Sequence, residues 1–236
     1  AGMSTVSGSI MIALVSMLSI QFPGINLIQH LVSASILSIP AAIMYANIMI
    51  PSSKITNFDG SSVPKVYDSS MDAITKGTRD GLEICLNVAA ILIAFIALVS
   101  LLNSILGIAG NWIGVNDLSL QLILGYIFFP IVWLMGVPVS EALTSAELLG
   151  LKTALNEFVA YGALANIESD LLSERSKLIT LYALCGFANF SSVGILVTGI
   201  SAMAPERKND LIKVSIKALI GATLASCMTG LVIGLF

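Results

Sequence analysis

Charged side chains are scarce in this sequence of 236 residues. Lys and Arg number 11 and Asp and Glu number 14, so charged residues make up 11% of the chain, less than half of the roughly 25% usual in soluble domains. Hydrophobic residues make up 56% and the mean hydropathy is +0.95. This balance excludes a soluble globular protein and a disordered chain. A net charge of −3 without a basic run excludes a nucleic-acid binder.

Cysteine is also scarce and is not spaced for chemistry. Cys85, Cys185 and Cys227 each lie inside an apolar stretch, where cysteine behaves as a small hydrophobic residue. The sequence contains no CxxC or CxxH spacing, so we expect neither a disulfide nor a metal cluster. It also lacks a Walker loop and a catalytic triad, which argues against an enzyme and against ATP as the energy source.

Long uncharged stretches take the place of the missing charge. Residues 1–53, 84–116, 118–140, 178–205 and 218–236 contain no Asp, Glu, Lys or Arg. A hydrocarbon core of ~30 Å is crossed by ~20 helical residues. The pattern therefore predicts an all-α polytopic membrane protein with about five spanning helices. We expect these spans at about 5–20, 27–50, 84–106, 178–202 and 212–236.

The predicted organisation has five parts. They are two spanning helices in 1–50, a cytoplasmic polar loop with an amphipathic helix in 51–83, a connecting span in 84–117, a re-entrant hairpin in 118–165, and two further spans in 166–236. The chain starts at Ala1 and enters an apolar stretch with no charged flank, so we expect no signal peptide with a basic n-region. We therefore expect a fragment whose preceding part is missing.

The stretch 118–165 is apolar but broken, and it carries charge. Pro130 interrupts its first half, Gly136-Val137-Pro138 follows, and the second half contains three Glu and one Lys. Irregular backbone survives at membrane depth only where protein or water surrounds it. The pattern therefore favours a re-entrant helical hairpin over two lipid-facing spans.

Basic residues are concentrated on one side of this topology. Residues 51–83 and 204–217 share a side if the spans alternate and the hairpin returns to its own side, and they hold eight of the 11 basic residues. The positive-inside rule then places both segments in the cytoplasm and the C-terminus outside.

A weak internal repeat supports the same organisation. Residues 2–8 lie over 186–192 with an offset of 184, and the same offset places Leu27-Ile28 over Leu211-Ile212. Because the two repeats begin spans of opposite direction, they predict an inverted-repeat transporter core. In such transporters the substrate site lies near the midplane, where the repeats meet.

Two polar residues are the strongest candidates for a site. Glu157 lies beside the broken segment, and a carboxylate at membrane depth is costly unless it is paired, hydrated or protonated. The alternative is that this segment lies outside the bilayer and that Glu157 is solvated. Asn189 lies mid-span in a run rich in Gly, Asn and Ser, which is compatible with unwound, cavity-lining backbone or with a seam between helices.

Two motifs give the sequence a specific resemblance. Residues 150–161 read GLKTALNEFVAY and match the pattern G-x-K-x-x-x-N-E-F-V-A-Y at every fixed position, and residues 185–192 read CGFANFSS. Gly136-Val137-Pro138 precedes the first motif, and residues 203–207, MAPER, follow the second. In these motifs the whole chain resembles the C-terminal part of the concentrative nucleoside transporter family.

The resemblance implies a homotrimeric, multi-pass symporter of the inner (cytoplasmic) membrane. It would import nucleosides with a sodium or proton gradient, need no other cofactor, contact membrane lipid and not bind nucleic acid. Its transport core would be an inverted pair of repeats, each a re-entrant hairpin followed by a partly unwound span and another span.

The family pattern also assigns roles to single residues of this sequence. Asn156 and Glu157 lie at the tip of the hairpin, Glu157 binds ribose hydroxyls, Asn189 and Ser192 also bind the ribose, Phe187 contacts the base, Ile10 lines the base pocket, and Thr5 by its side chain and Val6 by its carbonyl bind sodium.

One part of the family pattern has no counterpart here. The first hairpin, with its G-Q-T-E-type motif, is missing, so we expect this chain to hold about half of the pocket and not to transport alone. The competing hypothesis is a non-transporting membrane scaffold or assembly subunit, in which the polar residues only pack helices. A scaffold would tolerate Gln in place of Glu157, whereas a symporter would not. The residues do not distinguish sodium from proton coupling, or purine from pyrimidine nucleosides.

Overall fold

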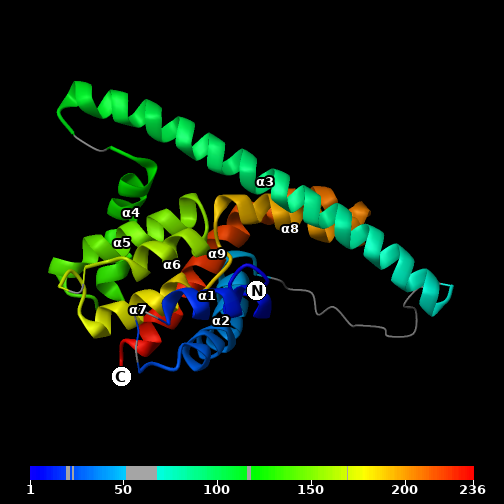
Figure 1. Cartoon of the computed structure of the whole chain (residues 1–236), viewed down its shortest axis with the longest axis horizontal. Helices are drawn as coiled ribbons and strands as arrows, with labels where there is room; N and C mark the ends of the chain where they lie inside the picture. Colours follow the sequence, from blue (N-terminus) through cyan, green and yellow to red (C-terminus); the bar gives the residue numbers. More distant parts are fainter. Residues whose placement is uncertain (20–21, 23, 52–67, 116–117, 169) are drawn as a thin grey trace.

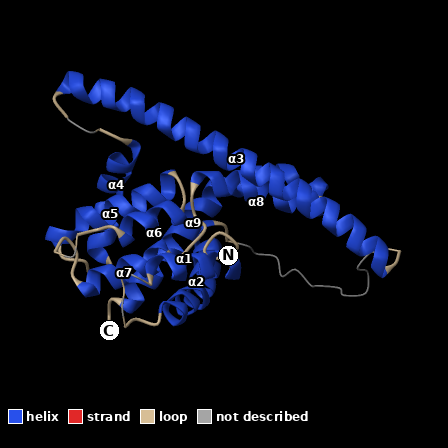
Figure 2. Cartoon of the chain, in the orientation of Figure 1, coloured by secondary structure: helices blue, strands red, loops and turns tan. Residues whose placement is uncertain are grey.

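The computed structural model describes residues 1–19, 22, 24–51, 68–115, 118–168 and 170–236. Within these ranges all regular structure is helical and no strand occurs (Figure 2), which confirms the predicted all-α class. The elements are α1 (Gly8–Leu18), α2 (Leu27–Met49), α3 (Ser70–Ile113), α4 (Leu120–Leu134), α5 (Val139–Ala154), α6 (Glu157–Ala165), α7 (Glu174–Leu184), α8 (Phe190–Met203), the short 3₁₀ helix η2 (Pro205–Arg207) and α9 (Lys208–Ile233).

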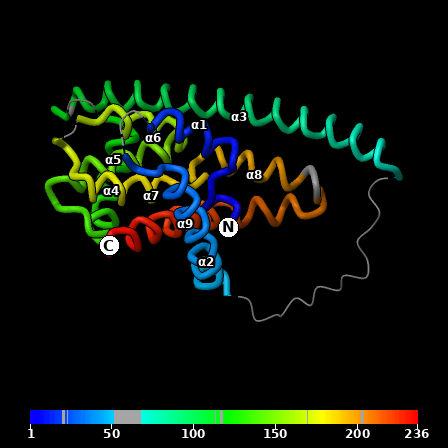
Figure 3. Tube along the Cα trace, turned by 60° about the horizontal axis from the view of Figure 1, so that its bottom comes forward, coloured from blue at the N-terminus to red at the C-terminus, as the bar shows by residue number. Residues whose placement is uncertain are grey.

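Most of the helices form one bundle, and α3 lies along its outside (Figures 1 and 3). In the bundle, α2 and α7 both pack against α9, and α4 packs along α5. Fully buried leucines from four helices meet in its core: Leu14, Leu31, Leu149 and Leu181. Helix α3 contacts the rest of the described chain chiefly through α8 and α4.

Helix α3 is one continuous helix of 44 residues, about 66 Å long at 1.5 Å per residue. It begins after Ser69, whose hydroxyl accepts a hydrogen bond from the N–H of Asp72 (3.1 Å), and it ends at Gly114 in the left-handed conformation (φ +76°). The helix passes without a break through the predicted boundary at 83/84. The predicted loop over 52–67 lies outside the described residues.

Three helices are long and apolar enough to cross a membrane, namely Leu27–Met49, Ser70–Trp112 and Pro205–Ile233. The sequence predicts about five spans, and the two that are missing from this set are the first and the fourth predicted spans. Residues 1–7 precede α1 without regular structure, which leaves a helix of 11 residues, and the fourth predicted span is divided into α7 and α8 by residues 185–189. The fourth span is therefore interrupted, as the resemblance implied, and neither segment reaches spanning length as a single helix.

The segment predicted as one hairpin contains three helices with two turns. The first turn, at residues 135–138, joins α4 to α5 and includes Gly136 with φ +93°. The second turn, Leu155-Asn156, joins α5 to α6, and these two helices pack against each other. The predicted tip residues Asn156 and Glu157 lie at the second turn, so we use "the hairpin" below for α5 and α6 only.

Candidate functional site

The N-termini of three helices carry side-chain caps near one another. The N–H of Ile10 donates to Ser7 Oγ at the start of α1 (3.4 Å), and the N–H of Val159 donates to Asn156 Oδ1 at the start of α6 (2.9 Å). Asn189 caps α8 in the same way. Helix N-termini carry partial positive charge, so this region of the bundle favours a negative or electron-rich group.

A cavity of about 340 Å³ and another of about 310 Å³ lie close to the N-terminal segment. The smaller one is lined by Gly2, Thr5, Val6, Ser7, Ile10, Glu157 and Phe187. It therefore brings together residues from the start of α1, the hairpin tip and the break between α7 and α8. Five of the eight predicted site residues line it.

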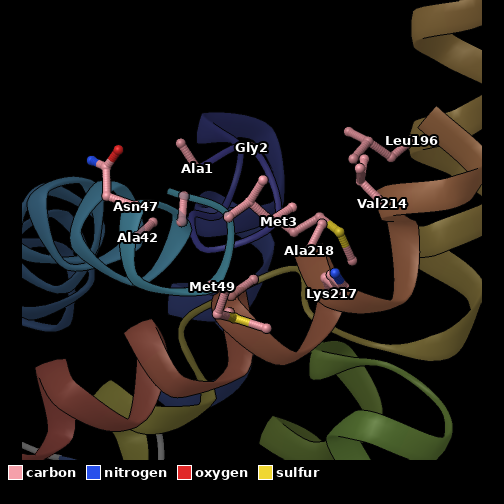
Figure 4. Close-up of a pocket in the computed structure, with 14 residues that line it drawn as sticks. Ala1, Gly2, Met3, Ala42, Asn47, Met49, Leu196, Val214, Lys217 and Ala218 are labelled. Atoms are coloured by element: carbon pink, nitrogen blue, oxygen red, sulfur yellow. The ribbon is translucent and has the colours of Figure 1, made fainter. Parts of the chain in front are cut away.

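The larger cavity is of a different kind (Figure 4). It lies between the N-terminal residues, the end of α2 and the first half of α9, and its polar side chains are Asn47 and Lys217. Figure 4 shows mainly small and apolar groups such as Met3, Met49 and Ala218 around it. None of the predicted site residues lines this cavity, so we place the candidate site at the smaller one, which we call the Glu157 pocket.

Glu157 is the acidic group of this pocket. It is the first residue of α6 and is only 2% exposed. Its Oε2 accepts a hydrogen bond from Nδ2 of Asn189 (3.1 Å). A buried carboxylate is costly unless hydrogen bonds or charges stabilise it, and here Asn189 and the N-terminus of α6 provide that stabilisation.

The orientation of Asn189 is set by its capping role. Its Oδ1 accepts from the N–H of Ser192 (2.7 Å) and from the hydroxyl of Ser191 (2.7 Å). In return, the Ser192 hydroxyl accepts from the N–H of Asn189 (3.1 Å), which completes a capping box. Because Oδ1 is occupied at the helix start, the Nδ2 group is directed to Glu157.

The eight predicted site residues thus have three different positions. Thr5, Val6, Ile10, Glu157 and Phe187 line the pocket. Asn189 is buried and contacts the pocket's carboxylate, whereas Asn156 and Ser192 form caps at its edge. Their roles toward a ligand stay predictions.

Ser7 and Gly2 also line the pocket, although neither was a predicted site residue. A serine just before an apolar helical run is a common N-cap signal, so Ser7 could have been found from the sequence. Gly2 carries no such signal. Nothing local indicates that its backbone reaches the cavity.

The tight packing of the break explains a glycine in the second motif. A Cβ built on Gly186 would overlap Oγ of Ser226 in α9 and would lie 3.2 Å from the carbonyl oxygen of Ser4. The residues before α1 and those before α8 therefore approach each other closely. A side chain there would require the Ser226 hydroxyl to leave its hydrogen bond with the carbonyl of Ala222, or α9 to shift.

Comparisons with known proteins show the family of this chain. The family model described as Na+ dependent nucleoside transporter C-terminus matches residues 30–234. An uncharacterized transporter of Haemophilus influenzae is 39% identical, and nucleoside permease NupC of Helicobacter pylori is 36% identical; each match covers 100% of this chain and 56% of the relative. Human solute carrier family 28 member 3 is 36% identical over 100% of this chain and 36% of its own length.

Solved structures show the same fold. CNTnw in an inward-facing substrate-bound state has a TM-score of 0.77 and 36% identity over 99% of this chain and 55% of that chain. A CNTnw variant in an intermediate state has a TM-score of 0.81 and 37% identity. This chain spans about half the length of the bacterial relatives it matches. The chain is a membrane protein of a transporter family, not an enzyme family, and it belongs to the Na+ dependent nucleoside transporters as their C-terminal domain.

Proposed function

We propose that this chain forms the C-terminal half of an ion-coupled symporter that imports nucleosides across the cytoplasmic membrane. The observation that carries the proposal is the buried Glu157 carboxylate, which lines a pocket together with Phe187 and is bonded to Asn189. In the assembled protein the chain would be part of one subunit of a homotrimer. The hairpin would be re-entrant. The non-helical segments before α1 and before α8 would belong to two inverted repeats.

The pocket suits the two chemical halves of a nucleoside. Ribose presents hydroxyl donors, and Glu157 presents a carboxylate acceptor. A site built to bond such hydroxyls strongly disfavours analogues that lack them. Phe187 and Ile10 supply an aromatic face and apolar area for the base. The rest of the pocket would come from the part of the relatives that has no counterpart in this chain.

The coupling ion would bind beside the nucleoside. A sodium ion prefers oxygen ligands, and unwound helix segments of transporters supply them as free carbonyls and hydroxyls. Thr5 has a hydroxyl and Val6 a carbonyl in the non-helical segment before α1, and both residues line the pocket. The family description supports sodium, while a proton would use the same pocket without these ligands.

Uptake of radiolabelled uridine by the full-length protein in liposomes tests the proposal. We expect an imposed sodium gradient to drive uptake well above the level without a gradient, and unlabelled uridine to compete, whereas free uracil should not. Uptake that a proton gradient drives, but a sodium gradient does not, would support the symporter with a proton as the coupling ion. Folded protein that gives no nucleoside-specific uptake with either gradient would contradict the proposal and favour the scaffold hypothesis.

Replacing Asn189 with Asp tests the link between the cap and the pocket. Asp caps helices as well as Asn, so the start of α8 should persist. The Nδ2 donor to Glu157 is lost, and two acidic groups then face each other. A hydrogen bond to a charged group contributes about 1.5–3 kcal/mol, so the KM for uridine should rise roughly tenfold or more. Asn166→Asp, at an exposed position where Nδ2 donates to the carbonyl of Gly162 (2.7 Å), is the control. An unchanged KM in Asn189→Asp would refute this link.

A further inference from the structure

The last carbonyl groups of α7 need hydrogen-bond donors from outside the helix. A helix that stops at Leu184 leaves its last four carbonyls without intrahelical N–H partners, and these carbonyls lie in the buried centre of the bundle. All four nonetheless accept hydrogen bonds. The carbonyl of Leu181 accepts from Tyr161 Oη (2.7 Å), and that of Ala183 accepts from Lys152 Nζ (3.0 Å). The carbonyl of Tyr182 accepts from the N–H of Cys185 (3.0 Å) and from Thr229 Oγ1 (3.3 Å). The carbonyl of Leu184 accepts from the N–H of Gly186 (2.8 Å).

Two of these donors come from the hairpin. Lys152 lies on α5 and Tyr161 on α6, so they stand on opposite sides of the hairpin tip, and both side chains are 0% exposed. A buried ammonium group needs compensation. The C-terminal end of α7 provides it, because helix C-termini carry partial negative charge. Lys152 also interacts electrostatically with Glu157.

These two bonds tie together the same elements that the site joins. The Glu157–Asn189 bond connects the hairpin tip to the start of α8. The bonds of Lys152 and Tyr161 connect the two arms of the hairpin to the end of α7, on the other side of the break. The hairpin is therefore bonded to the chain on both sides of the break between α7 and α8.

We propose that Lys152 and Tyr161 are positioning residues, which hold the hairpin tip in register with the break and thereby hold Glu157 against Asn189. The pair forms what we call the α7 clamp. The effect of the clamp on nucleoside affinity rests on the proposed function, but its role in holding the hairpin against the end of α7 does not. Neither residue lines the Glu157 pocket, so their effect on the ligand would be indirect, and the Glu157–Asn189 bond is the path that the proposal gives it.

The packing of α7 separates this role from general stability. Helix α7 lies closely against α9, where a Cβ on Gly230 would be 2.9 Å from the carbonyl oxygen of Ile179 and 3.2 Å from Cβ of Ala183. Loss of a hairpin donor leaves this contact intact. We therefore expect the clamp variants to loosen the hairpin relative to α7 while α7 stays on α9.

Amide hydrogen exchange of the full-length protein in detergent tests the clamp without any ligand. Tyr161→Phe removes only the hydroxyl, and Tyr126→Phe, at a side chain that is 63% exposed, is the matched control. We expect exchange in residues 185–190 to become about tenfold faster in Tyr161→Phe, the effect of losing one buried hydrogen bond, and to stay unchanged in Tyr126→Phe. Equal exchange in both variants would overturn the clamp.

A double-mutant cycle on uridine KM tests the path to the ligand. Tyr161→Phe should raise the KM about tenfold in the native background, but less than twofold when Asn189 is already Ser, which keeps a helix cap and removes the donor to Glu157. Lys152→Met should behave in the same way, and Tyr161→Phe alone decides if that variant does not fold. Additive effects would overturn the positioning role. If the native protein transports no uridine, the proposed function fails, and hydrogen exchange alone then decides the clamp.

Discussion

Replacing Glu157 with glutamine in the full-length protein is expected to abolish gradient-driven uridine uptake. Glutamine keeps the size of the side chain and can still accept from Asn189, so the local packing should persist. It removes the negative charge that would accept from ribose hydroxyls beside the pocket-lining Phe187. A hydrogen bond to a charged group contributes about 1.5–3 kcal/mol, so two ribose hydroxyls together account for a loss of roughly a hundredfold or more in kcat/KM.

A second carboxylate provides the control for this experiment. Glu168 lies eleven residues further along the chain and is exposed. Glu168→Gln changes the net charge by the same amount and should leave uptake unchanged. If Glu157→Gln transports like Glu168→Gln, the carboxylate is not part of the nucleoside site, and the residue only packs helices as the scaffold hypothesis holds.

Replacing Gly150 with alanine is expected to destabilise the protein by about 2 kcal/mol. A Cβ at this position would lie 2.5 Å from the carbonyl oxygen of Gln121 and 3.1 Å from the backbone nitrogen of Gly125, both in α4. These are backbone atoms, which cannot rotate away, so α4 and α5 must separate. Overpacking costs typically 1–3 kcal/mol, here at the upper end because backbone is displaced, and the better helix propensity of Ala returns about 1 kcal/mol.

Thermal unfolding in detergent measures this effect. Gly81→Ala is the matched control, because Gly81 also lies within a helix and a Cβ there would meet nothing within 4 Å. Its melting temperature should stay constant or rise, whereas that of Gly150→Ala should fall. A melting temperature of Gly150→Ala at or above the native value would show that α4 and α5 are not held at this distance.

The sequence predicted where the helices lie along the chain better than it predicted where each helix begins and ends. Uncharged runs located α2, α3 and α9, and the Gly, Asn and Ser run located the break between α7 and α8. These predictions succeed because hydropathy and helix capping depend on neighbouring residues. The predicted boundary at residue 83 does not interrupt α3. Charge marks where a membrane-embedded stretch ends, but a helix can continue beyond that point.

The sequence also indicated most of the pocket residues, but only by resemblance to a known motif. Its composition alone left Asn189 between a cavity and a helix seam. In the structure this residue does not line the pocket; its Oδ1 caps α8 and its Nδ2 donates to Glu157, which does line it. A side chain with two functional ends cannot be assigned from its neighbours in the chain.

What the sequence determined by itself is the helical class, the membrane setting and the break between α7 and α8. The resemblance added the position of the acidic residue at the hairpin tip. The break that Pro130 predicted is absent, because α4 continues through this proline. The tertiary structure alone decided which breaks meet and which donors reach the carbonyls at the end of α7. Lys152 and Ala183 are 31 residues apart, and Tyr161 and Leu181 are 20 apart. Helix starts are set by bonds to residues three or four positions away, but these long-range bonds form only after the hairpin and α7 have packed together.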